Sequence, residues 1–322
     1  PYPALALSFP ELATPAQQAR NASGVDLDFI VDTAANTNTL NAYVAKELGL
    51  EAVGDAPGGV ATGGAIAGGK TFMLGKAELA DVPKPERQPF IGGLTASALP
   101  VASPAAAGLL SCAFLFSFPG GVEMSWGDGA QVPPSISLYG DTEGLKEEVL
   151  VDLCEVPAEQ LPESGLISVK LRVNGVDIPA LLDTGSPISV LNRAAAEAAG
   201  LEVPNTEPAN ESQSTSGFNP FAKFQERLKA AEAAAAEAAS GEVVRIASAT
   251  GVPVELRRAL PTASIELGAA KLGQDLRCYV GELPGLHALG GLGDGAGPAA
   301  VLGLDLLRRR RKLVLSEGRV YV

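Results

Sequence analysis

A short pattern occurs twice in this chain, namely an Asp-Thr pair directly after an apolar run. Residues 30–35 read Ile-Val-Asp-Thr-Ala-Ala and residues 181–186 read Leu-Leu-Asp-Thr-Gly-Ser. The offset of 151 positions (183 − 32) continues beyond the pattern, because Leu-Asn recurs at 40–41 and 191–192 and Gly-Leu-Glu recurs at 49–51 and 200–202. A chain of 322 residues is long enough for two domains. The repeat therefore predicts two copies of one structural unit, each with a carboxylate at the same place.

Two carboxylates that face each other can hydrolyse peptide bonds. Carboxyl groups about 3 Å apart do not both ionise, so the pair shares one proton. The ionised member takes a proton from a water molecule that attacks the peptide carbonyl, and the protonated member polarises that carbonyl. Because such a pair titrates as a unit, neither role is assigned permanently to Asp32 or to Asp183.

The two loops and the segments after them resemble the retropepsin-like aspartic proteases. Units of this family have an Asp-Thr-Gly loop after a strand, a helical turn ending in Gly-Leu, a Gly-rich flap and a late apolar-apolar-Gly segment. The late segment is Val301-Leu302-Gly303 in the second unit and Leu109-Leu110-Ser111 in the first. The resemblance implies an all-β fold, with two tandem retropepsin-like (acid protease) closed barrels forming a pseudo-dimer, short helices and one inserted Ala-rich helix.

The resemblance also implies roles for residues around the two aspartates. Thr33 and Thr184 would hold the two loops together through their hydroxyls. Gly185 has no Cβ and would let backbone amides approach the carboxylate of Asp183, and Ser186 would hydrogen-bond the outer oxygen of that carboxylate. The loops would pack against the late segments, at Leu302 and Gly303 in the second unit and at Leu110 and Ser111 in the first.

Two stretches lie where the family has its flaps. Residues 58–69 are rich in glycine and include Gly63 and Gly64, and residues 246–254 surround Thr250 and Gly251. A Gly-rich hairpin can open and close over an extended peptide that pairs as an added strand. We therefore expect an extended peptide or protein substrate, and the alternative for the first stretch is a disordered surface loop.

The first flap stretch also satisfies a phosphate-binding pattern. Residues 64–71 match G-x-x-x-x-G-K-T. That mechanism needs a strand before the loop and a helix after it, so that the phosphate meets a helix N-terminus. Gly and Pro precede the pattern here and the residues after it read as a strand, so the sequence argues against nucleotide binding.

Two residues of the first unit depart from the family pattern. Ala34 stands where the family has Gly, and Ser111 stands where the second unit has Gly303. A methyl group at position 34 crowds the dyad or shifts its loop, and a shift of about 1 Å can lower a rate about 100-fold. The leading hypothesis is an active aspartic endopeptidase. The alternatives are a pseudoprotease that binds peptides or acts as a scaffold, and a homodimer in which two chains pair through their second units.

We predict a first unit at 1–127, a linker at 128–146 and a second unit at 147–322. Residues 204–241 have no counterpart in the first unit, and the Ala- and Glu-rich part of this insertion predicts a solvated helix. Asn174-Gly175 favours a tight turn with positive φ between two strands. Other strands are expected at 4–9, 25–31, 71–82 and 313–322, and helical turns at 41–50 and 193–200.

Charge and composition exclude several kinds of partner and mechanism. The net charge of −13 argues against nucleic acid and against anionic membranes, and no apolar run approaches the roughly 20 residues that span a bilayer. The single histidine, His287, excludes Ser-His-Asp and Cys-His catalysis and a histidine-based metal site. We expect no metal and no cofactor. The basic run at 308–312 is expected to cover the exposed side of a short helix.

Cysteine usage bears on the compartment. Cys112, Cys154 and Cys278 are an odd number without metal-like spacing, which favours a reducing intracellular compartment over a disulfide framework. Since the chain begins at Pro1 without Met, we expect the true N-terminus, and with it any targeting segment, to be absent from this sequence.

Overall fold

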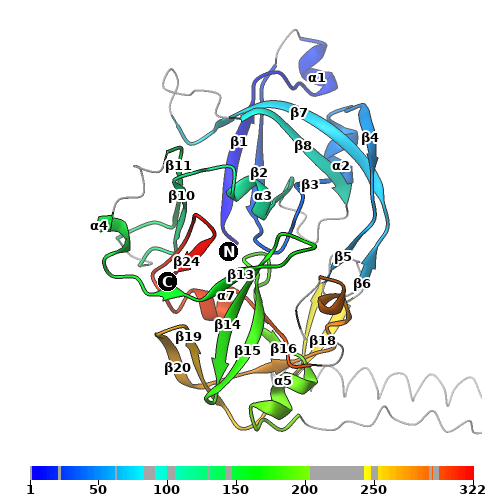
Figure 1. The fold of residues 1–322 in the computed structure, drawn as a ribbon. Coiled ribbons are helices and arrows are strands. Elements are labelled where there is room, and N and C mark those ends of the chain that lie inside the picture. Colours follow the sequence, from blue (N-terminus) through cyan, green and yellow to red (C-terminus); the bar gives the residue numbers. More distant parts are fainter. Residues whose placement is uncertain are drawn as a thin grey trace, which may run out of the picture.

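The computed structural model describes residues 2–20, 23–61, 64–82, 91–99, 106–128, 131–141, 147–203, 243–247, 253–289, 292 and 297–322. Strands dominate these segments and form two units, one blue to cyan and the other green to orange in Figure 1. The marked chain ends lie where the two units meet (Figure 1). The inserted segment 204–241 lies outside the described residues, so its helix stays a prediction.

The first unit is a closed barrel of six strands, as the sequence predicts. The order around it is β1, β2, β9, β3, β8 and β7, and β7 pairs back with β1. Alternate residues of β1 point inward, so that Leu5, Leu7 and Phe9 are buried. The strands are β1 (Ala4–Phe9), β2 (Val25–Val31), β3 (Thr39–Asn41), β7 (Gly69–Leu79), β8 (Ile91–Leu99) and β9 (Gly108–Leu110), with β4 (Ala52–Ala56) beside β7.

The second unit is a ten-stranded sheet. It differs from the expected closed barrel, because no pairing among the described residues joins its two ends. In order along the sheet, the strands are β17 (Val243–Ala247), β18 (Pro253–Arg258), β21 (Tyr279–Val280), β16 (Val190–Leu191), β22 (Ala300–Leu302), β15 (Val176–Leu182), β14 (Ile167–Val173), β19 (Ala263–Leu267) and β20 (Ala270–Leu276), with β13 (Ala158–Gln160) on β14.

The repeat in the sequence reappears as a repeat in local structure. The helices α2 (Ala42–Glu47) and α5 (Arg193–Ala198) begin after the asparagine caps Asn41 and Asn192. Both end at a glycine with positive φ, 63° at Gly49 and 68° at Gly200, a conformation that glycine adopts without steric cost. The predicted turn between β14 and β15 also has positive φ at its two central residues, 49° at Asn174 and 82° at Gly175.

A third sheet joins the two units. Its order is β11 (Ser135–Tyr139), β10 (Gly121–Ser125), β23 (Lys312–Ser316), β24 (Arg319–Tyr321) and β12 (Glu155–Val156). β10 of the first unit pairs with β23 of the second, so that Met124 lies opposite Leu313. Part of the predicted linker is therefore the strand β11, and the closing segment 313–322 belongs to the hairpin β23–β24. The two units are docked on each other through backbone hydrogen bonds.

The remaining elements are short. They are α1 (Pro15–Gln18), β5 (Gly59–Ala61), β6 (Gly64–Ile66), α3 (Cys112–Leu115), α4 (Glu147–Leu150), the 3₁₀ helix η1 (Pro284–Leu289) and α7 (Leu304–Leu307). The basic run follows α7, where the Arg308 guanidinium lies 5.7 Å from the ring centre of Trp126 and Lys312 Nζ lies 2.7 Å from Glu123 Oε1. In the part of the chain that is described, no helix has the length and apolar character needed to cross a membrane.

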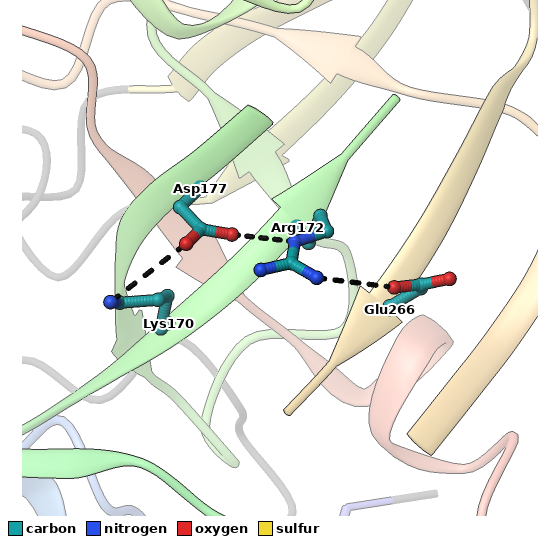
Figure 2. A network of polar contacts seen from close by, with 4 residues as sticks. All are labelled: Lys170, Arg172, Asp177 and Glu266. Carbon is teal, nitrogen blue, oxygen red and sulfur yellow. Dashed lines mark hydrogen bonds and ion pairs between the residues drawn. The ribbon is translucent and has the colours of Figure 1, made fainter. Parts of the chain in front are cut away.

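The outer face of the second sheet is polar. Lys170 and Arg172 are the exposed positions of β14. Figure 2 shows Arg172 between Asp177 of β15, at 2.7 Å, and Glu266 of β19, at 3.8 Å, with Lys170 also 3.8 Å from Asp177. Exposed ion pairs of this kind contribute little stability, so the network chiefly marks the face of the sheet that meets water.

Replacement of Val314 by alanine tests the packing of the third sheet. Val314 is fully buried in β23, and its truncation should lower the free energy of unfolding by about 2 kcal/mol. The matched control is Val53→Ala, because Val53 in β4 is 61% exposed and surface changes cost less than about 0.5 kcal/mol. Urea unfolding followed by Trp126 fluorescence measures both, and equal effects would contradict this packing.

Candidate active site

Asp32 and Asp183 occupy equivalent places in the two units. Asp32 follows β2 and its amide donates to Leu110 O at 2.9 Å, while Asp183 follows β15 and its amide donates to Leu302 O at 3.0 Å. β2 runs parallel to β9, and β15 runs parallel to β22. Each late segment therefore holds the aspartate of its own unit by a backbone hydrogen bond.

The two loops are joined by reciprocal hydrogen bonds between their threonines. The amide of Thr33 donates to Thr184 Oγ1 at 3.1 Å, and the amide of Thr184 donates to Thr33 Oγ1 at 3.0 Å. Each hydroxyl also donates across the interface at 2.7 Å, Thr33 to Leu182 O and Thr184 to Val31 O. Both threonines are fully buried. The four bonds follow one pseudo-twofold axis and fix the two aspartate loops against each other.

Gly185 brings the second loop into contact with the first aspartate. A Cβ at Gly185 would lie 2.5 Å from both Cγ and Oδ2 of Asp32. No side chain fits in that space, so glycine is required there. The sequence predicts a glycine for the approach of amides to Asp183, and hydrogen bonds from the Gly185 and Ser186 amides do lower the pKa of that group. The close approach to Asp32 is a second reason for glycine at position 185.

Burial raises the pKa of both carboxyl groups. It raises the pKa of Asp32 to about 6, although hydrogen bonds from the Ala34 and Ala35 amides lower it. Burial and then the charge of Asp32 raise the pKa of Asp183 well above its ordinary value. Because each charge opposes the next ionisation, the pair retains a proton at a pH where isolated aspartates have lost theirs.

Ser186 differs from its expected arrangement. Its hydroxyl donates to Ile188 O at 2.8 Å, so its backbone amide, rather than its side chain, acts on Asp183. Ala34 is half-buried and packs against the apolar cluster that contains Cys112 and Leu181. The Ala34 amide donates to Asp32 Oδ1 at 2.8 Å, so this loop orients its carboxylate despite the added methyl group.

The substitution at Ser111 is accommodated by a partner that the sequence analysis missed. A Cβ at Gly303 would lie 2.7 Å from the carbonyl carbon of Ile188, so this position needs glycine. Ser111 is buried, and both its amide and its hydroxyl donate to Asn38 Oδ1 at 3.0 Å. In the second unit the Gly303 amide donates to Ser189 Oγ at 2.9 Å. Asn38 and Ser189 lie 151 positions apart, so the repeat offset was the signal that could have found them.

The first flap hairpin reaches the second unit. β5 and β6 pair as antiparallel strands and contact η1. Gly64 begins β6, while Gly63, Thr250 and Gly251 lie outside the described residues. The second hairpin is β17 and β18, with Ile246 opposite Val254. The residues Lys70 and Thr71 of the phosphate-binding pattern lie within the strand β7, which begins two residues before the predicted strand at 71–82.

One protein family matches part of the chain. Residues 169–227 match an aspartyl protease family, and this stretch contains β15, the loop of Asp183 and α5. The matched stretch includes the Asp-Thr-Gly-Ser loop of the second unit. No curated protein sequence matches the chain.

A crystal structure of basic 7S globulin from soybean aligns with 100% of this chain and 94% of its own. Its sequence identity is 12% and the TM-score is 0.44.

Removal of the Thr33 hydroxyl tests the link between the loops. Thr33→Val leaves Leu182 O and the Thr184 amide without their partners. This should cost about 2–6 kcal/mol of unfolding free energy, since each unsatisfied buried group costs about 1–3 kcal/mol. Urea unfolding measures the loss. Thr95→Val, at an exposed position of β8, is the matched control. A variant with the stability of the wild type would show that the link is not needed.

Proposed function

We propose that this chain is an aspartic endopeptidase whose active site is completed within one chain. The observation that carries the proposal is the reciprocal bonding of Thr33 and Thr184, because it fixes the loops of Asp32 and Asp183 against each other. The fit of Gly185 against the Asp32 carboxyl supports it. The match of residues 169–227 to an aspartyl protease family is consistent with this reaction class.

In the proposed reaction the pair of carboxyl groups carries one proton. The ionised member takes a proton from a water molecule, whose oxygen bonds to the peptide carbonyl carbon. The protonated member gives its proton to the carbonyl oxygen, which leaves a neutral gem-diol. The carboxyl group that took the water proton then gives it to the nitrogen, and the other takes a proton from a gem-diol hydroxyl. The C–N bond breaks, which leaves a carboxylic acid and an amine. The raised pKa values of Asp32 and Asp183 favour the singly protonated pair that these steps need.

The proposed substrate is an extended peptide or protein. An extended chain can add its backbone hydrogen bonds to a strand edge, while its side chains occupy pockets on alternate sides. The hairpin β5–β6 belongs to the first unit and contacts η1 of the second, so it lies across the boundary between the units. This arrangement suits a cover over a peptide bound between them.

The proposed enzyme is a pseudo-dimer within one chain. Each of the two threonines already has its partner in the other unit, and β10 already pairs with β23. Pairing of two chains through their second units would require both sets of contacts to be broken. The proposal therefore favours the single-chain enzyme over the homodimer.

Substitution of either aspartate should abolish peptide cleavage. Asp32→Asn and Asp183→Asn each remove a carboxylate that the reaction needs, whereas Asp28→Asn, at an exposed position of β2, the strand that leads to Asp32, should leave cleavage unchanged. The wild-type rate should rise through a pKa near that of Asp32, about 6, because below it both carboxyl groups are protonated and no general base is present. Cleavage of a peptide library across pH measures this. Loss in Asp183→Asn alone would favour the homodimer.

The second candidate function is a pseudoprotease that binds peptides. Ala34 favours it, because the equivalent glycine of the other loop has no room for a Cβ beside the opposite carboxylate. By the pseudo-twofold axis, Ala34 occupies the position in the first loop that Gly185 occupies in the second. The methyl group either crowds the site or is accommodated by a small shift of the loop.

A matched pair of substitutions separates these two functions. Gly185→Ala puts a Cβ 2.5 Å from Asp32 Cγ, and the resulting shift should lower kcat/KM about 100-fold. Ala34→Gly removes the methyl group from the equivalent position of the first loop and should raise kcat/KM of an active enzyme. Ala35→Gly is the control, because it also adds a glycine that makes the loop more flexible. Steady-state cleavage of one peptide measures all three. A wild type without cleavage, whose activity Ala34→Gly does not restore, would support the pseudoprotease.

A further inference from the structure

Tyr2 lies beside the first aspartate. Ala4 pairs with Ile30 at the end of β1, and the Val31 amide donates to Pro3 O at 2.9 Å, which extends the antiparallel pairing by one residue. The next pair in this register is Tyr2 with Asp32. Directly opposite residues of an antiparallel pair point to the same face, with Cβ atoms about 4.5–5.5 Å apart. The register therefore brings the phenol to the face of the sheet where the Asp32 carboxyl lies.

In the second unit, the strand register places a different residue opposite the aspartate. Ser168 pairs with Leu181, so the residue opposite Asp183 is Leu166. Leu166 is 2% exposed and packs in the apolar cluster that contains Cys112 and Leu161. Tyr2 is 37% exposed. The pseudo-twofold axis thus relates a closed apolar position beside Asp183 to an open aromatic position beside Asp32.

The electrostatics place the phenol close to both carboxyl groups of the pair. Burial, then the charge of Asp183 and then that of Asp32 raise the pKa of the Tyr2 hydroxyl. Both carboxyl groups of the pair therefore act on one phenol. A tyrosine with a raised pKa keeps its proton at neutral pH, so its hydroxyl is available as a hydrogen-bond donor.

We propose that Tyr2 is a substrate-binding residue, whose ring forms the wall of the cleft beside Asp32 and whose hydroxyl donates a hydrogen bond to the bound peptide. The proposal rests on the proposed peptidase function. An exposed ring offers an apolar face to a peptide side chain, and Leu166 offers no equivalent surface beside Asp183. The substrate side chain on the Asp32 side of the scissile bond is then selected for its contact with an aromatic ring.

Two substitutions separate the hydroxyl from the ring. Tyr2→Phe removes only the hydroxyl and should lower kcat/KM about 2- to 10-fold, the effect of one neutral hydrogen bond. Tyr2→Ala also removes the ring and should broaden the side-chain preference on one side of the scissile bond in a peptide library. Tyr43→Phe and Tyr43→Ala are matched controls, because Tyr43 in α2 is 66% exposed, and both should match the wild type.

A binding measurement keeps this test independent of cleavage. A peptide with a hydroxyethylene group in place of the scissile amide resembles the tetrahedral intermediate, and its dissociation constant is measured by calorimetry. Weaker binding by Tyr2→Phe and Tyr2→Ala supports the proposal even if the wild type cleaves no peptide, an outcome that would overturn only the peptidase function. Wild-type values for both variants in cleavage and in binding would overturn the role of Tyr2. Faster cleavage by Tyr2→Ala would also overturn it, because the side chain would then obstruct the cleft.

A spectroscopic titration tests the placement of the phenol directly. The absorbance change on ionisation of Tyr2 is the difference between the wild type and Tyr2→Phe. In Asp183→Asn one of the charges that oppose this ionisation is removed, so the pKa of Tyr2 should fall. An unchanged pKa would place the phenol away from the pair and overturn the proposal.

Discussion

The structure depends on the hydrogen bonds that Thr33 and Thr184 exchange. Their atoms are fully buried, and each bond joins one unit to the other. A buried hydroxyl or amide without a partner is costly, so each unit supplies what the loop of the other needs. The same four hydrogen bonds therefore stabilise the fold and fix the geometry of the aspartate pair. Neither loop has its full set of hydrogen-bond partners in an isolated unit.

The two halves of the site are equivalent in backbone but different in chemistry. The second loop has Gly185, which fits against Asp32, while the first has Ala34. Ser111 with Asn38 replaces the pair Gly303 with Ser189, and the replacement keeps every buried polar atom of Ser111 hydrogen-bonded. The first unit therefore has a different packing of the same loop, rather than a loop whose supporting contacts are missing. The difference concerns how each carboxyl group is surrounded.

The sequence predicts the parts of this fold that short-range physics determines. The turn at Asn174-Gly175, the glycines that end the two short helices and the strands that lead to Asp32 and Asp183 all follow from local preferences. The open second sheet could not be predicted, because closure depends on pairing between distant strands. β11 was hidden by the glycine and proline residues around it, although Ile136 and Leu138 alternate with polar residues. The contact of Gly185 with Asp32 joins the two units, and a local motif carries no information about it.

The third sheet delays completion of the site until residues far along the chain have been synthesised. β10 ends at residue 125, yet its partner β23 begins only at residue 312. Val322 then exchanges backbone hydrogen bonds with Cys154. When only the first unit has left the ribosome, the edge of β10 that pairs with β23 is still open, and only the loop of Asp32 is present. Such non-local pairings form slowly, so the two aspartate loops reach their final arrangement only after the residues of β23 have left the ribosome.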